Sequence, residues 1–381
     1  MKIKTNTKKR DLILTVIAVA ALVGILAFLE ANKAQNSYTI SIIERSCIYA
    51  VVAVSMNLLT GFTGLFSLGQ AGFMAIGAYV TAILTIPPQS RASVYYVNGI
   101  ADWLANLSLP LVPALLVGGI FAAAFAALIG IPVLRLKSDY LAIATLGFAE
   151  IIRALIAAPA FDRVTNGSYG LKSIPAFSSI FVPVAIAAVC IIVMALLLRS
   201  SYGRAFKAIR EDEVAAEAMG INLFKHKQLS FVISSFFTGV GGGLLAVFMR
   251  SIDSKTFQVS LTYNILLIVV LGGIGSITGS IIGSFLVMGG QEWLRFCDEP
   301  MFIGNFQIPL FRTGFRMVIF SILLMAVVLF WRRGIMGDRE FSWQGLFDFC
   351  KSIPRRIKNI PSHFKRKKQT KMPEIRKGGE K

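Results

Sequence analysis

Repeated apolar runs, each about as long as a membrane is thick, limit what this sequence can fold into. Of the 381 residues, 55% are hydrophobic and 15% are charged, against about 25% charge in a typical soluble domain. The runs are continuous and roughly 20 residues long, the length that an α-helix needs to cross a hydrocarbon core of about 30 Å. A transmembrane β-barrel would instead need short alternating segments. The sequence therefore predicts an all-α polytopic membrane protein.

Nine apolar regions mark the expected spans, at residues 12–29, 40–60, 62–86, 111–134, 140–158, 180–198, 229–249, 261–290 and 315–331. A signal peptide is the alternative interpretation of the first run. That run has 18 residues, more than a typical signal-peptide core, and no A-x-A cleavage pattern follows it. We therefore expect a retained first span.

The region at 261–290 is interrupted by the sequence GGIGS at 272–276. If this region crossed the membrane once, the basic tail would face the outside, against the positive-inside rule. We therefore expect the chain to turn at these glycines and to pass twice. The two passes would be short or broken, with non-helical backbone covered by protein or lining a water-filled cavity. The total is then about ten transmembrane helices.

Basic residues are distributed among the expected loops as the positive-inside rule requires. Lysine and arginine precede the first span, occupy the turn at 135–137, contribute six residues to the loop at 199–228 and contribute 15 after residue 330. Loops 30–39, 88–110 and 159–178 are poor in them. Both termini are therefore predicted to be cytoplasmic. This distribution also explains the net charge of +19, so we expect a lipid membrane and no nucleic acid as a partner.

Two parts follow from this distribution, a transmembrane domain at 1–332 and a basic cytoplasmic tail at 333–381. In the tail, aromatic residues between 341 and 349 precede a basic run at 365–368. That order is typical of an interfacial helix that contacts anionic lipid. A solvated tail is the alternative.

The cytoplasmic loop at 199–228 is the one long, highly charged segment between apolar runs. Residues 204–219 are expected to form one helix that ends at Gly220, because glycine readily adopts the left-handed conformation that closes a helix. Its apolar stripe would comprise Ala205, Ile209, Ala216 and Met219. Such a helix can lie in a groove of another protein, whereas a solvated connector would not need the stripe.

Two glycine-rich stretches lie within the expected spans, at 61–77 and 272–283. Ten spans divide into five plus five, and an odd number per half would make any repeat inverted in the membrane. Glycine-interrupted segments at comparable places in two halves indicate a transport path near the midplane. The candidate path residues are Ser67, Gly69, Gln70, Gly72, Gly275, Ser276 and Gly279. Close helix packing through small residues is the alternative.

No catalytic, cofactor or metal site is expected from the residue types and their spacing. The four cysteines are widely scattered and form no CxxC or Cys/His cluster. No phosphate-binding GxxxxGK[ST] sequence occurs. Glu150 and Arg153 lie three residues apart on one helix face, so a mutual ion pair is the simpler interpretation of these intramembrane charges, and a functional role is the alternative.

The sequence REDEVAAEAMGIN at 210–222 resembles the coupling loop, or EAA loop, of ATP-binding-cassette (ABC) permeases. Further motifs are GLFSLGQAGFMAIGAY (64–79), SDYLAIATLGFAEIIR (138–153), TNGSYGL (165–171) and LGGIGSITGSIIGS (271–284). With them, residues 40–332 resemble the permeases of branched-chain amino-acid importers. The loop departs from the broad pattern, because Val214 stands where that pattern has the glutamate of Glu-Ala-Ala. Glu213 lies one position before that place, and Gly220 lies at the position of the pattern's glycine.

The resemblance implies a permease subunit in the plasma (inner) membrane, and not an enzyme. Two cytoplasmic ABC ATPases would bind the coupling loops, a second related permease would pair with this chain, and an extracytoplasmic binding protein would deliver leucine, isoleucine or valine. Similar permeases serve urea, amides and other amino acids, so the solute stays open. The implied coupling residues are Arg204, Arg210, Glu213, Ala215, Ala216, Glu217 and Gly220.

Two competing functions remain distinguishable. An ion-coupled secondary transporter of amino acids would need no partner ATPase, and it would more naturally carry an unpaired intramembrane acid. A membrane enzyme would need clustered polar catalytic residues facing one interface, and the sequence shows none.

Overall fold

The computed structural model describes residues 3–97, 99–136, 138–294, 302–303, 306–307, 318, 321–322, 325, 329, 334–337 and 340. The chain divides into two compact units, residues 1–17 with 341–381 and residues 18–340. Helix α1 (Ile3–Ala31) begins in the first unit. All the other described elements lie in the second unit.

Helices dominate the described residues, as predicted. The longer ones are α1, α2 (Ser37–Asn57), α3 (Gln70–Thr85), α6 (Leu111–Val133), α7 (Ser138–Ala157), α9 (Phe181–Arg199), α12 (Leu223–Met249), α13 (Val259–Gly272) and α14 (Ile277–Trp293). The shorter ones are α4 (Pro88–Val94), α5 (Asp102–Ala105), α8 (Asp162–Thr165), α10 (Ser201–Glu211) and α11 (Glu213–Ala218). A π-helical turn, η1 (Leu58–Phe62), extends α2, and 3-10 turns occur at η2 (Pro159–Phe161), η3 (Gly167–Tyr169) and η4 (Ser254–Phe257). Strands β1 (Phe302–Ile303) and β2 (Phe306–Gln307) pair antiparallel.

Six of the described helices are long and apolar enough to cross a membrane, namely α1, α2 with η1, α6, α7, α9 and α12. Helices α3 and α4 form a pair bent by 120°, which makes seven candidates if the pair is one span. Helices α13 and α14 have 14 and 17 residues. The expected span at 315–331 lies outside the described residues apart from isolated positions, so the count of ten stays a prediction.

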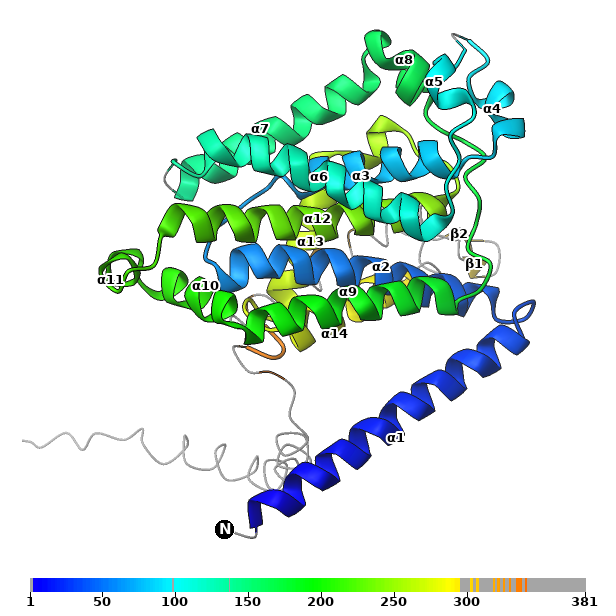
Figure 1. Ribbon diagram of the computed structural model, residues 1–381. Helices are drawn as coiled ribbons and strands as arrows, with labels where there is room; N and C mark the ends of the chain where they lie inside the picture. The colour runs from blue at the N-terminus through cyan, green and yellow to red at the C-terminus, as the bar shows by residue number, and fades with distance from the viewer. Residues whose placement is uncertain are drawn as a thin grey trace, which may run out of the picture. The chain divides into compact units, whose positions relative to one another are not determined.

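Helix α12 packs against α3, α6 and α2 (Figure 1). Glycines bring these backbones close together: a methyl group at Gly77 would lie 2.0 Å from the Gly239 carbonyl oxygen, and one at Gly242 would lie 2.1 Å from that of Met74. Lipid tails are as apolar as the side chains, so moving a side chain from lipid into a helix interface gains little. Helices in a membrane therefore associate mainly through close van der Waals packing. The small residues therefore account for the centre of the bundle.

The third expected span was wrong at its start. The prediction placed it at 62–86, but α3 begins at Gln70, and the residues after η1 have no regular structure. Side chains from distant helices satisfy this backbone and the first turn of α3. Thr145 of α7 accepts from the Leu68 amide at 3.0 Å, and Thr262 of α13 accepts from the Ala71 amide at 3.1 Å. Non-helical backbone at membrane depth needs such cover by protein.

The helix break predicted within 261–290 is confirmed. Helix α13 ends at Gly272, and α14 begins at Ile277 with Ser276 as its N-cap, whose hydroxyl accepts from the Gly279 amide at 3.1 Å. The two helices cross in close contact, since a methyl group at Gly272 would lie 2.2 Å from the Gly279 carbonyl oxygen. At Gly272 and Gly279, the small residues thus serve helix packing.

The connecting segments of the second unit gather at two opposite ends (Figure 1). The α1–α2 turn and helices α4, α5 and α8 lie at one end, on the right of the view, and α10 and α11 lie at the other. We call these the loop-rich end and the α10–α11 end. The loops poor in basic residues are at the loop-rich end, and the charged loop at 199–228 is at the α10–α11 end, as the charge distribution requires.

Candidate coupling site and transport path

The charged loop contains two helices, not the single helix predicted at 204–219. Helix α10 ends at Glu211 and α11 begins at Glu213. Asp212 separates them in an extended conformation, and its carboxylate accepts from the amides of Val214 and Ala215 at 2.9 and 3.1 Å. Aspartate is a favourable N-cap because its oxygen satisfies amides that a new helix leaves unpaired. Asp212 therefore starts a second helix at Glu213 instead of letting α10 continue.

Gly220 ends α11 as predicted. Its φ is +84°, its amide donates to the Glu217 carbonyl at 2.9 Å, and the Ile221 amide donates to the Ala216 carbonyl at 3.1 Å. This pair of bonds satisfies the last carbonyls of the helix. A side chain at position 220 would be strained in this left-handed backbone.

The predicted apolar stripe is correct in part. Ile209 and Ala216 are buried, but Met219 is 83% exposed, because the break at Asp212 changes the direction of the helix. Phe206 is fully buried and is the main anchor that the sequence analysis missed. Val214, on the short α11, is 78% exposed. One face of the loop thus packs on the protein while apolar side chains of α11 remain uncovered.

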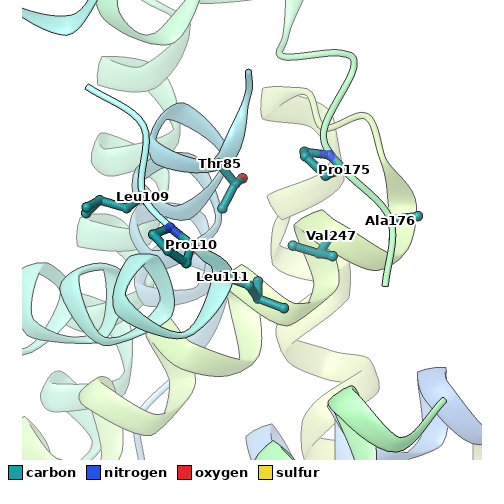
Figure 2. Close-up of a pocket in the computed structure, with 7 residues that line it drawn as sticks. All are labelled: Thr85, Leu109, Pro110, Leu111, Pro175, Ala176 and Val247. Carbon is teal, nitrogen blue, oxygen red and sulfur yellow. The ribbon is translucent and has the colours of Figure 1, made fainter. Parts of the chain in front are cut away.

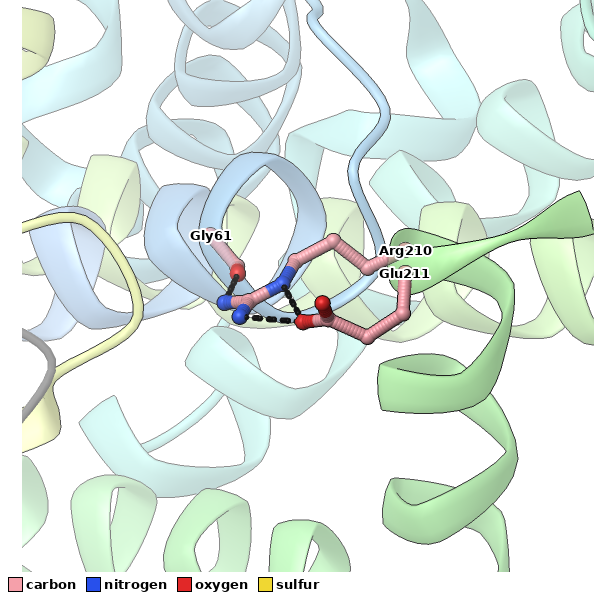
Figure 3. A network of polar contacts seen from close by, with 3 residues as sticks. All are labelled: Gly61, Arg210 and Glu211. Atoms are coloured by element: carbon pink, nitrogen blue, oxygen red, sulfur yellow. Dashed lines mark hydrogen bonds and ion pairs between the residues drawn. The ribbon is translucent and has the colours of Figure 1, made fainter.

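Arg210 connects the end of α10 with both glycine-rich stretches, and Figure 3 shows its bond to Gly61 in the first of them. Its Nη1 donates to the Gly61 carbonyl oxygen at 2.7 Å, and its Nη2 lies 2.7 Å from Oε1 of Glu211. Methyl groups at Gly64 and Gly275 would lie 3.1 Å from Cγ and 2.9 Å from Nη1 of Arg210, respectively. The glycines therefore allow the arginine to approach two backbone segments far apart in sequence.

Asn57 holds the same two segments together. Its side chain is fully buried, it donates to the Ser276 carbonyl at 2.9 Å and to the Ser280 hydroxyl at 2.8 Å, and it accepts from the Gly275 amide at 2.8 Å. Sequence analysis missed this residue, although it is the one amide side chain in the apolar run at 40–60. The carboxylate of Glu340 caps the same turn, since it accepts from the amides of Ile277 and Thr278 at 2.8 and 3.1 Å.

The candidate path residues of the first stretch lie around the start of α3. Gln70 is buried and belongs to a polar cluster with Ser55, Ser234 and Thr238. The Thr238 hydroxyl donates to the Gln70 side-chain oxygen at 2.6 Å and lies 2.8 Å from the Ser55 hydroxyl. Ser67 is buried and accepts from the Gly69 amide at 3.3 Å.

The remaining path candidates pack against neighbouring helices. A methyl group at Gly72 would lie 2.8 Å from Cα of Ala149 in α7. The turn into α14 contains Gly275, Ser276 and Gly279. This turn meets the first glycine-rich stretch at Gly61, since a methyl group at Gly61 would lie 2.5 Å from the Gly275 nitrogen.

The other implied coupling residues lie on the exposed side of the loop. Arg204 donates to the Ser201 hydroxyl at 3.0 Å, and Glu213 forms an ion pair with Lys227 of α12 at 2.6 Å. Ala215 and Glu217 are exposed. Surface ion pairs of this kind contribute roughly 0–1 kcal/mol, so the ion pair alone does not fix α11 in place.

The intramembrane ion pair predicted in the fifth span is confirmed. Arg153 and Glu150 are 2.7 Å apart, with about a third of each side chain exposed (30% and 34%). The two charges satisfy each other on one face of α7.

The TNGSYGL motif joins the segments of the loop-rich end. Asn166, at φ 56°, donates to the carbonyls of Val94 and Gly170 at 3.0 and 2.7 Å. The Tyr95 hydroxyl donates to the Val164 carbonyl at 2.7 Å, and burial raises the pKa of this phenol to about 12, so it stays a neutral donor at physiological pH. The Asn166 bonds thus give the motif a structural role at this end.

A small apolar cavity lies where the end of α3, the start of α6 and the C-terminal part of α12 meet the segment at 175–176 (Figure 2). It has a volume of about 250 Å³ and is lined by Thr85, Leu109, Pro110, Leu111, Pro175, Ala176 and Val247. No ionisable side chain is among these residues. The cavity therefore offers no site for a charged group.

Comparison with known proteins agrees with the sequence motifs. The sequence model of the family described as "Branched-chain amino acid transport system / permease component" matches residues 38–328. The high-affinity branched-chain amino acid transport system permease protein LivM of Escherichia coli (strain K12) is 33% identical over 295 residues, which cover 68% of this chain and 64% of that protein. The chain thus matches less than two thirds of that relative's length.

More distant relatives include a second type of permease and a sugar permease. The probable branched-chain amino acid transport permease protein LivH of Methanocaldococcus jannaschii is 26% identical over 314 residues, 78% of this chain and 92% of that protein. The galactofuranose transporter permease protein YtfT of Escherichia coli (strain K12) is 26% identical over 276 residues, 68% and 73% of the two chains. No solved structure matches this chain.

The family match covers most of the chain, and these relatives are transport permeases rather than enzymes. Together with the apolar helices, it identifies a multi-pass protein of the inner membrane. The chain belongs to the family of branched-chain amino acid transport system permease components.

Proposed function

We propose that this chain is the transmembrane permease subunit of an ABC importer and moves branched-chain amino acids, or a related small polar solute, into the cell by alternating access. The contact made by Arg210 carries this proposal. A single side chain of the charged loop bonds to Gly61 and lies so close to Gly275 that a methyl group there would be 2.9 Å from its Nη1, one glycine in each glycine-rich stretch. A displacement of α10 would therefore be transmitted to both stretches.

Two cytoplasmic ATPases would bind α10 and α11 and would carry out ATP hydrolysis, which this chain itself would not perform. Support comes from Val214 and Met219, which are 78% and 83% exposed in a strongly charged loop. Exposed apolar groups rimmed by polar residues are typical of protein contacts. The break at Asp212 leaves α11 attached to α10 as a separate short helix that can fit into a groove of a partner.

A second, related permease and an extracytoplasmic solute-binding protein would complete the importer. The similarity of this chain to LivM and LivH proteins, two related permeases, supports pairing of related subunits. The names of these relatives also support branched-chain amino acids as the solute. The galactofuranose relative shows that similar chains serve other solutes, which is why a related small polar solute stays in the proposal.

The path would pass the buried polar groups at the start of α3 and the turn into α14. Gln70, Ser67 and the hydroxyls of α12 provide hydrogen-bonding groups inside the bundle, where most buried side chains are apolar. Polar residues inside a membrane bundle are costly and commonly mark a solute path. Gly69, Gly72, Gly275 and Gly279 would leave the neighbouring backbone without side chains, and Ser276 would add only a small hydroxyl.

Charge reversal at Glu213 and Glu217 together, and separately Gly220→Arg, tests the docking role. Both changes are expected to uncouple ATP hydrolysis from uptake while the protein remains inserted in the membrane. The reversals change the surface that would meet the ATPase, and Gly220→Arg strains the left-handed turn that fixes the end of α11. The measurement is solute uptake and ATP hydrolysis by the complex in proteoliposomes.

The matched control is Asp102→Lys, which reverses an exposed acid on α5 at the loop-rich end and should leave the coupling unchanged. Normal uptake by both loop variants would refute the docking role. Uptake driven by an ion gradient in vesicles without any ATPase would instead establish the competing secondary transporter.

A further inference from the structure

A second cavity, about 290 Å³ in volume, opens beside the α1–α2 turn, the start of α2 and the C-terminal end of α12. Three ionisable side chains line it, Lys33, Glu44 and Arg250. The charges of Lys33, Glu30 and Arg250 all act on the half-buried Glu44 carboxylate, and the Lys33 and Arg250 side chains are exposed. Lys33 also pairs with Glu30 at 3.8 Å, whereas neither Glu44 nor Arg250 has an ion-pair partner among the described residues.

The rest of the lining is mostly apolar. Ile40 and Val247 are buried with 4% and 2% exposure, and the ring of Phe248 adds to this wall. A cavity with an unpaired carboxylate, an unpaired guanidinium and an apolar wall suits a ligand that carries both charges and an apolar body. Ligand cavities commonly measure about 300–1,000 Å³, so this one fits only a small molecule.

We propose that this cavity binds a zwitterionic amino acid with an aliphatic side chain. Glu44 receives the α-ammonium group, Arg250 receives the α-carboxylate with support from Lys33, and the side chain packs against Ile40, Val247 and Phe248. The apolar cavity of Figure 2 shares Ala176 and Val247 with this one but has no charged lining. Recognition of a zwitterion therefore belongs to the charged cavity.

The backbone of Arg250 supports a role for its side chain. Arg250 is the C-cap of α12 with φ 58°, a left-handed conformation in which glycine is the favoured residue. A non-glycine residue held in this region stores backbone strain, which is common at binding sites. The cavity lies at the loop-rich end, which the charge distribution predicts to face the outside, so it is a receiving site for the arriving solute. This ligand class rests on the proposed import function.

Equilibrium binding to the full chain in lipid nanodiscs, without ATP or a binding protein, tests the assignment. The probes are L-leucine, L-leucinamide, which lacks the carboxylate, and 4-methylpentanoate, which lacks the amine. Glu44→Gln should weaken leucine binding roughly tenfold, because it removes a hydrogen bond to a charged group. This variant should lose the preference for leucine over 4-methylpentanoate and keep the preference for leucine over leucinamide. Arg250→Gly should weaken leucine binding by a similar factor. This variant should lose the preference for leucine over leucinamide and keep the preference for leucine over 4-methylpentanoate.

Two exposed residues of the loop-rich end provide charge-matched controls, Asp102→Asn and Arg163→Gln, which should bind leucine as the unchanged chain does. Arg250→Gly also separates binding from folding. Glycine relieves the left-handed backbone, so the melting temperature of this variant should be no lower than that of the unchanged chain.

Unchanged leucine affinity in both variants, or no saturable leucine binding by the unchanged chain, would overturn the assignment. So would variants that bind leucine normally but lose uptake when the binding protein is present, since the charges would then serve its docking. If the complex takes up solute with ATP but the two variants do not lose their respective preferences for leucine, only this binding site is overturned. If the variants lose those preferences but the complex shows no ATP-driven uptake, only the proposed import mechanism is overturned.

Discussion

Arg210 makes contacts that link a charged surface loop to the interior of the bundle. Its guanidinium bonds to Gly61, 149 residues away in sequence, and to the neighbouring Glu211. The resemblance to ABC permeases identified Arg210 as a coupling residue, but local spacing could not show which backbone it reaches. Asn57 was missed for the same reason, because a lone amide in an apolar run does not specify its partners. At this scale, sequence supplies candidates and tertiary structure supplies their contacts.

Accessibility of single cysteines tests the path at the residue scale. In a chain whose four native cysteines are replaced by alanine, Ser67→Cys and Gln70→Cys should react with a water-soluble thiol reagent in one nucleotide state of the complex and not in the other. Alternating access predicts this difference, because each side of the path opens in only one state. Alkylation with and without a non-hydrolysable ATP analogue measures it.

The control for that experiment is Ala122→Cys, a fully buried position of α6 in the helix packing, which should remain unreactive in both states. Uniform inaccessibility of positions 67–73 and 275–283 in both states would leave helix packing as the role of the two glycine-rich stretches.

Among the elements, those defined by local sequence were predicted well. Helices α6 and α9 lie within one residue of the expected spans because uniform apolar runs with polar flanks define both ends. Helix α3 starts late because Thr145 of α7 satisfies a non-helical segment that is apolar enough to resemble a helix, and Thr262 of α13 accepts from the Ala71 amide in the first turn of α3. The two helices of the charged loop separate at Asp212 because its side chain caps the second one. Errors therefore occurred where a side chain replaced regular backbone hydrogen bonding.

Close packing of α3 against α12 predicts opposite effects of two glycine substitutions. Gly242→Ala places a methyl group 2.1 Å from the Met74 carbonyl oxygen, so the helices must separate, and we expect a stability loss of about 1–3 kcal/mol, as for an overpacked core. Gly147→Ala in α7 meets no atom within 4 Å. Its higher helix propensity should leave stability unchanged or raise it by up to about 1 kcal/mol. Thermal unfolding in detergent measures both, and equal effects would contradict the packing account.

In the whole molecule, the charge distribution and the position of the loops agree. Loops poor in basic residues and the charged cavity lie at the loop-rich end, and the Arg210 contacts lie at the α10–α11 end. The sequence predicted an all-helical membrane protein and predicted which loops lie together at each of its two ends. It could not specify how many helices cross the membrane, because α13 and α14 are short and the α3–α4 pair is bent. Those features depend on packing, which an apolar run does not encode.

The central claim is that motion of the charged loop reaches the glycine-rich stretches through Arg210. The most direct measurement is the number of solute molecules imported per ATP hydrolysed by the reconstituted complex carrying Arg210→Ala. Loss of the bond to Gly61 predicts continued ATP hydrolysis with a lower ratio. Lys225→Ala, which removes one exposed positive charge at the same end, should leave the ratio unchanged. A ratio in Arg210→Ala equal to that of the unchanged chain would contradict the account.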